Sequence, residues 1–123
     1  MNQTALRAYI TDDEAEVREA LRLLLEQKLG CQIVGEAAHT HGLISLVGSV
    51  HADLVLIDWE LPDRVDARLL ASLHQLVSRP RIIVCSSYPD LKEAALAAGA
   101  DAFAGKGDPP EHLLTVVRAQ LSN

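Results

Sequence analysis

The stretch Leu54-Val-Leu-Ile-Asp58 decides the fold, because four apolar residues run without interruption and stop at a carboxylate. A short apolar run of this kind is typical of a strand that helices cover on both faces of a parallel sheet. A second run, Ile82-Ile-Val-Cys85, has the same character and stops at Ser86. We therefore predict two buried strands, each with a polar side chain at its carboxyl end.

Three weaker apolar runs predict further strands. Residues 6–10 lead into the acidic pair Asp12-Asp13, and residues 33–35 form a short run that ends in a glycine. Residues 102–104 stop two positions before Lys106. These runs bring the number of predicted strands to five, and three of the five lead into charged residues.

Apolar residues at helical spacing fill the segments between these strands. In residues 14–29 the stripe is clear, and Gly30 follows it as a C-terminal glycine should. Weaker patterns predict helices through residues 43–47, through residues 69–77 before Pro80, and over residues 89–98 before Gly99. A last helix is predicted after Asp108, where two prolines and an acid mark its first turn.

The strict alternation of strand and helix predicts an α/β fold with a parallel sheet and right-handed crossovers. In such a sheet, functional groups gather at the carboxyl ends of the strands. One pocket is therefore expected to collect three carboxylates, a hydroxyl and an ammonium group: Asp12, Asp13, Asp58, Ser86 and Lys106. That combination can hold a divalent cation and a phosphoryl group together.

Composition limits the other possibilities. With 123 residues, 49% of them hydrophobic, the chain is expected to form one domain over residues 1–123. A net charge of −6 argues against direct binding of nucleic acid, and no apolar stretch is long enough to span a membrane. Cys31 and Cys85 lie in or beside apolar runs and are expected to be free, which fits a cytoplasmic protein.

With these five polar residues in order, the chain resembles the receiver domain of two-component response regulators over essentially its whole length. Leu61-Pro62 after Asp58 and the aromatic Phe103 before Lys106 are further matches. Residues 34–37 and 106–111 are most similar to receivers of transcription factors with a helix-turn-helix output. The resemblance implies a flavodoxin-like (βα)5 doubly wound sheet with strand order 2-1-3-4-5, and a signalling domain rather than an enzyme.

The resemblance also implies roles in Mg²⁺-dependent phosphoryl transfer. Asp58 is expected to accept the phosphoryl group from a phosphohistidine on a histidine kinase or phosphotransfer protein. Mg²⁺ is expected at Asp12, Asp13, Asp58 and the backbone carbonyl of Glu60, with Asp12 acting through a bound water. Lys106 would bind a second phosphoryl oxygen as a point charge.

The switch implied by the resemblance begins at Ser86. Its hydroxyl would move toward the phosphoryl group, with its neighbour Ser87 setting access, and Phe103 would turn inward into the space left behind. This movement would change the face built by the fourth helix, fifth strand and fifth helix. A second copy of the chain, or an output domain that is C-terminal or separate, would dock there.

Three positions and the length of one stretch depart from the family pattern. Asp63 and Ala67 stand where the loop after the acceptor commonly has glycines, so that loop is expected to be rearranged. The stretch from Ser86 to Lys106 is short, which predicts a shortened fourth helix or leading loop. Gly107 stands where many receivers have a proline.

Two other functions stay open at this point. The altered loop and fourth helix would also suit a receiver-like interaction module that no longer uses phosphorylation. A phosphohydrolase similar to the haloacid dehalogenase superfamily would use the same residue types. That superfamily needs a second aspartate two positions after the nucleophile, where this chain has Glu60.

Overall fold

The computed structural model describes residues 5–121 and shows strands and helices in alternation. The strands are β1 (Arg7–Thr11), β2 (Gln32–Ala37), β3 (Leu54–Asp58), β4 (Arg81–Ser86) and β5 (Ala102–Gly105). The helices are α1 (Ala15–Leu29), α2 (Leu43–Ser49), α3 (Ala67–His74), α4 (Lys92–Ala97) and α5 (Pro110–Leu121). A 3₁₀ turn, Pro89–Leu91, leads into α4.

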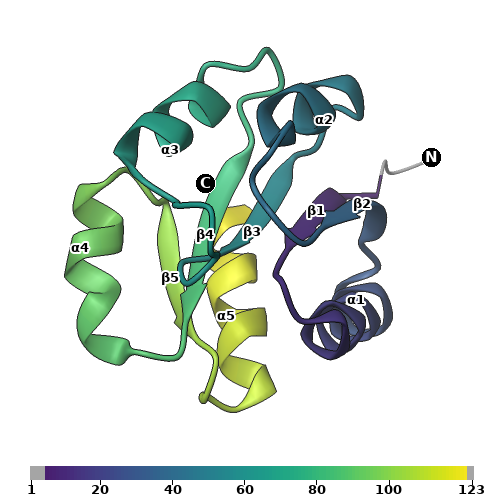
Figure 1. The fold of residues 1–123 in the computed structure, drawn as a ribbon. Helices are drawn as coiled ribbons and strands as arrows, with labels where there is room; N and C mark the ends of the chain where they lie inside the picture. Colours follow the sequence, from purple (N-terminus) through teal and green to yellow (C-terminus); the bar gives the residue numbers. More distant parts are fainter. Residues whose placement is uncertain (1–4, 122–123) are drawn as a thin grey trace.

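The five strands form one parallel sheet in the order β2-β1-β3-β4-β5 (Figure 1). The predicted flavodoxin-like fold and its strand order are confirmed. The order reverses direction next to β1, so the crevice above the carboxyl ends of β1 and β3 lies at the switch point of the sheet.

Alternate side chains of the sheet face two separate apolar layers, with α2, α3 and α4 on one side and α1 and α5 on the other (Figure 1). On β3, Val55 and Ile57 pack toward the first layer, while Leu54 and Leu56 pack toward the second. All five residues of β3 are buried, as its unbroken apolar run predicted. Burial on both faces fixes the position of Asp58 at the strand's end.

Both cysteines are buried and free, as predicted. They lie in the same apolar layer, between the sheet and helices α1 and α5. Burial raises the pKa of the Cys85 thiol to about 12, so this side chain behaves as a small apolar residue at neutral pH. Within the described part of the chain, no helix has both the length and the apolar character needed to cross a bilayer.

The predicted extent of the third helix was wrong. Leu76 and Val77 were expected to continue its buried stripe up to Pro80, but α3 ends at His74 and Val77 is fully exposed. The last residue of α3 makes a tertiary contact that the apolar pattern does not reveal, since His74 Nε2 lies 2.8 Å from Asp101 Oδ2. The same carboxylate oxygen accepts a hydrogen bond from the Ile82 amide at 2.7 Å, which ties the end of α3 to the start of β4.

The predicted helix over residues 89–98 was also too long. Its first turn is the 3₁₀ turn, and regular α-helix covers only the six residues of α4. Pro89 stands at the first position of the 3₁₀ turn, where its fixed φ and missing amide hydrogen cost nothing. Gly99 follows the helix with a φ of +116°, as a terminating glycine does.

Candidate functional site

Four strand ends supply the polar residues of the pocket, as the alternating pattern predicted. Asp58 and Ser86 are the last residues of β3 and β4, while Asp12 and Lys106 directly follow β1 and β5. Backbone hydrogen bonds continue beyond the strands: the Lys106 amide donates to the Ser86 carbonyl at 2.8 Å, and the Asp12 amide donates to the Ala37 carbonyl at 3.0 Å. The sheet itself therefore holds the side chains in register.

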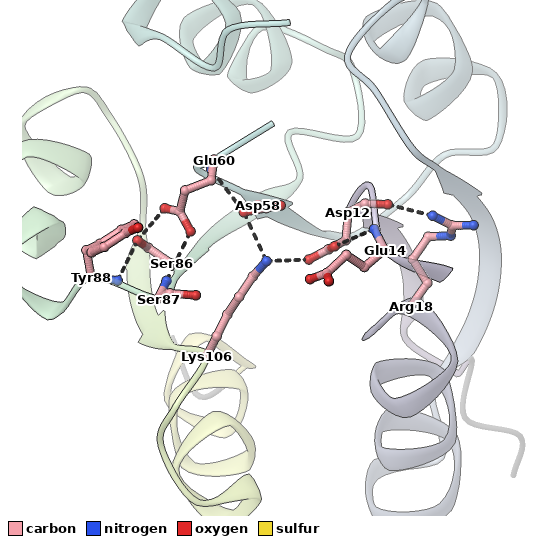
Figure 2. A network of polar contacts seen from close by, with 9 residues as sticks. All are labelled: Asp12, Glu14, Arg18, Asp58, Glu60, Ser86, Ser87, Tyr88 and Lys106. Atoms are coloured by element: carbon pink, nitrogen blue, oxygen red, sulfur yellow. Dashed lines mark hydrogen bonds and ion pairs between the residues drawn. The ribbon is translucent and has the colours of Figure 1, made fainter. Parts of the chain in front are cut away.

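Lys106 is the cation at the centre of this pocket (Figure 2). Its Nζ lies 2.8 Å from Asp12 Oδ2 and 3.1 Å from Asp58 Oδ1. Burial by itself would lower the pKa of Lys106, but hydrogen bonds to the two carboxylates outweigh it and raise the pKa above its ordinary value. Lys106 is therefore charged at every physiological pH.

Asp58 is an almost completely buried carboxylate, with 2% of its surface exposed. Burial raises its pKa above the ordinary value, and the nearby charge of Asp12 acts in the same direction. The Glu60 amide, which donates to Asp58 Oδ1 at 2.9 Å, and the Lys106 ammonium oppose this rise. The surroundings of Asp58 thus disfavour its negative charge, so a further cation nearby would stabilise the ionised carboxylate.

The acidic pair lies beside Asp58. Ligand oxygens of Asp12, Asp13 and Asp58 all lie within 4.8 Å of one another, with Asp13 exposed and the other two buried. Hard carboxylate oxygens are the ligands that Mg²⁺ prefers, and an open side leaves room for its retained waters. Three carboxylates face one ammonium group here, so the donor chemistry and the charge balance both fit a divalent cation.

The loop after β1 is braced by α1. The Glu14 amide donates to Asp12 Oδ1 at 2.9 Å, and Arg18 donates to the Asp12 carbonyl at 2.7 Å. Arg18 also pairs with Glu36 on β2, at 3.3 Å between Nε and Oε1. The sequence reasoning did not identify Arg18, although its place one turn into the helix after an acidic pair is a usable signal.

Ser86 lies on the opposite side of Asp58 from Asp12, and its partner is Glu60 (Figure 2). The Ser86 hydroxyl donates to Glu60 Oε2, and the Ser87 amide donates to Glu60 Oε1 at 3.1 Å. The prediction considered Glu60 only for its backbone carbonyl, so this use of its carboxylate was missed. The signal was its position just beyond β3, since β4 with Ser86 is paired beside that strand.

Phe103 does not line the acidic pocket. It is buried in the apolar layer under α2, α3 and α4, and it borders a groove of about 420 Å³ that α5 residues such as His112 and Val116 also line. Its backbone leads through β5 to Lys106. Phe103 therefore borders the predicted interaction face and lies on the same strand that leads to Lys106.

The loop between β3 and α3 has its own fastening. The Thr40 amide donates to Asp63 Oδ2 at 2.8 Å, and the Thr40 hydroxyl also contacts Asp63 at 2.9 Å. Positive φ, which glycine would favour, falls on Arg64 at +45° and not on Asp63 or Ala67. Ala67 is instead the first residue of α3, after Asp66 caps that helix through the Leu69 amide.

The response regulator receiver domain family matches residues 8–118, so the chain belongs to that family. It is 32% identical over 111 residues to an uncharacterized transcriptional regulatory protein, YhcZ, of Bacillus subtilis, an alignment that covers 89% of this chain and 52% of that protein. It is 30% identical over 115 residues to the nitrate/nitrite response regulator NarL of Escherichia coli, covering 92% of this chain and 53% of NarL. The chain thus spans about half the length of these relatives.

Solved structures agree with this assignment. A CheY-like response regulator receiver domain protein from Methanospirillum hungatei superposes with a TM-score of 0.82 at 27% identity, covering 97% of this chain and 95% of that one. The resemblance inferred from five polar residues is therefore confirmed at the level of family and fold. The chain is a receiver domain of the kind found in two-component response regulators.

Proposed function

We propose that Asp58 is the phosphoryl acceptor of this receiver domain. An Asp58 carboxylate oxygen attacks the phosphorus of a phosphohistidine, the P–N bond breaks, and its electron pair stays on the imidazole nitrogen of the donor. The product is an acyl phosphate on Asp58. The observation that carries the proposal is the contact of buried Asp58 with Lys106, beside the cluster that Asp58 forms with Asp12 and Asp13.

Each neighbouring residue has a part in this transfer. Lys106 neutralises one phosphoryl oxygen, and the Ser86 hydroxyl donates a hydrogen bond to another. The exposed side chain of Ser87 borders the approach to the acceptor. Strand ends place the Lys106 and Ser86 side chains on either side of Asp58, close to where charge develops.

Asp12, Asp13, Asp58 and the Glu60 backbone carbonyl are the groups that would hold Mg²⁺. The cation supplies positive charge that offsets repulsion between a carboxylate and an incoming phosphoryl group. Asp13 is the exposed member of the acidic cluster, so a cation held there would be open to solvent on that side.

Output would pass through β5 to the face of α4, β5 and α5. Movement of Ser86 toward the phosphoryl group opens space for Phe103, and the groove of about 420 Å³ beside Phe103 changes shape with it. The partners are a histidine kinase or phosphotransfer protein on the input side, and an output domain or a second copy on this face. We also propose that the domain does not bind nucleic acid directly and that it acts in the cytoplasm.

Trp59 gives a direct test, since it follows Asp58 and its amide donates to the Cys85 carbonyl at 2.8 Å. Addition of beryllofluoride with Mg²⁺ should change Trp59 fluorescence saturably, and Asp58→Asn should abolish the change. Wild-type protein that binds Mg²⁺ but shows no response to beryllofluoride would contradict the proposal. That result would favour an interaction module without phosphorylation, for which the six-residue α4 is the supporting observation.

A further inference from the structure

The carboxylate of Glu60 occupies two hydrogen-bond donors beside the acceptor (Figure 2). One oxygen accepts from the Ser86 hydroxyl, and the other accepts from the Ser87 amide at 3.1 Å. The Tyr88 amide in turn donates to Ser86 Oγ at 3.0 Å. Ser86 is completely buried, so bulk water does not offer its hydroxyl another partner.

These contacts occupy the donors of Ser86 and Ser87. A serine hydroxyl has one proton to donate, and a backbone amide has one. Both protons point at Glu60, while the Tyr88 amide already occupies an acceptor position on Ser86 Oγ. A phosphoryl oxygen on Asp58 can receive the Ser86 hydrogen bond only after the Glu60 carboxylate has left it.

Charge adds to this competition. Glu60 is anchored next to Asp58, because its own amide donates to Asp58 Oδ1 at 2.9 Å. A phosphoryl group on Asp58 carries between one and two negative charges, and like charges in a partly buried site repel each other strongly. The carboxylate and the phosphoryl oxygens therefore exclude each other both as acceptors and as anions.

We propose that the Glu60 carboxylate is an internal competitor for the phosphoryl-binding donors, and that it sets how tightly the pocket takes a phosphoryl group. The inference rests on the proposed function of Asp58 and goes beyond it by assigning a role to a side chain. The apparent affinity equals the intrinsic affinity multiplied by the fraction of molecules in which the Ser86 and Ser87 donors are free. In a variant without the Glu60 carboxylate, these donors are expected to be free to bind a phosphoryl group or its analogue.

The test compares beryllofluoride binding by wild-type protein, Glu60→Gln and Glu60→Ala at saturating Mg²⁺, followed by ¹⁹F NMR. Glutamine removes the charge and leaves one acceptor, whereas alanine removes both contacts. Because charge-assisted hydrogen bonds of this type are strong, both variants should bind beryllofluoride about tenfold more tightly than wild type. In the unliganded protein, the ¹⁵N–¹H signal of Ser87 should shift in both variants.

Asp90→Asn is the matched control, since Asp90 is an exposed acid in the 3₁₀ turn after Ser86 and its loss changes the net charge equally. It should leave the affinity and the Ser87 signal unchanged. Circular dichroism and a Mg²⁺ titration serve as checks that each variant is folded.

Unchanged or weaker beryllofluoride binding in both folded Glu60 variants, with normal binding by wild type, would overturn this inference alone. Absence of binding by all forms that still bind Mg²⁺ would overturn the proposed function of Asp58, and this inference with it. Tighter beryllofluoride binding by both Glu60 variants than by wild type, with Asp90→Asn unchanged, would support the inference.

Discussion

At the scale of single residues, the pocket is an excess of negative charge held together by one lysine. Asp12 and Asp58 are buried, and both contact the Lys106 ammonium. Such a site is costly when empty, because desolvated carboxylates repel each other and are only partly compensated by a single cation. In the proposed function, a bound Mg²⁺ would offset this repulsion.

One consequence concerns Asp58→Asn. Burial, reinforced by the charge of Asp12, raises the pKa of Asp58. The ionised carboxylate is therefore less stable in the folded chain than in the unfolded one. Asparagine removes that charge while Asp12 keeps its contact with Lys106 at 2.8 Å. We expect the variant to be more stable than wild type at neutral pH in EDTA, by about 1 kcal/mol, a typical size for one substitution.

Urea unfolding with and without Mg²⁺ checks this. Saturating Mg²⁺ should stabilise wild type much more than Asp58→Asn, because a ligand that binds only the folded state adds stability. A variant that is less stable than wild type in EDTA would show that the Lys106 contact outweighs the burial of the charge.

At the scale of elements, the loop between β3 and α3 combines a strained residue with a fastening. Arg64 has a φ of +45°, a region where side chains with a Cβ are disfavoured. Arg64→Gly should therefore stabilise the fold by about 0.5–1 kcal/mol. Arg68→Gly is the matched control inside α3, where glycine should destabilise by a similar amount. Equal destabilisation by both substitutions in thermal unfolding would contradict the assigned strain.

The fastening through Asp63 predicts a dependence on pH. Slight burial acts to raise the pKa of Asp63, but hydrogen bonds from Thr40 outweigh it and lower the pKa below its ordinary value of 3.8. A lowered folded-state pKa gives stability that is present above pH 3.8 and is lost as the pH falls through the folded-state value. Solvent screening keeps the contribution small, at about 0.5 kcal/mol for an exposed carboxylate.

Asp63→Asn should therefore be slightly less stable than wild type at neutral pH, and the difference should shrink below pH 3.8. Guanidinium unfolding at a series of pH values between neutral and acidic measures this stability difference, with Asp90→Asn as an exposed control. A difference that grows on acidification would be incompatible with this direction of the pKa shift.

At the scale of the whole molecule, much of the fold follows from the sequence because the buried strands are so plainly apolar. The runs before Asp58 and Ser86 predicted β3 and β4 together with the residues at their ends. The convergence of Asp12, Asp58 and Lys106 then follows from parallel strands, and the structure places these three in contact.

The features that were missed depend on contacts between distant segments. The last residue of α3, His74, contacts Asp101 from a distant part of the chain, and the apolar pattern that continues to an exposed Val77 gave no sign of this. The chain turns after β3 so that the Glu60 carboxylate reaches Ser86. No spacing rule predicts which acidic side chain accepts the Ser86 hydrogen bond. The strain at Arg64 similarly arises from the loop path that Asp63 and Thr40 fix.

The central claim is that Asp58 becomes phosphorylated in a pocket assembled from four strand ends. Its most direct test is intact-mass measurement after incubation with acetyl phosphate and Mg²⁺. Wild type should gain the mass of one phosphoryl group, and the gain should be absent in Asp58→Asn and in EDTA. A wild-type protein that gains no mass, or an Asp58→Asn variant that gains the same mass, would contradict the account.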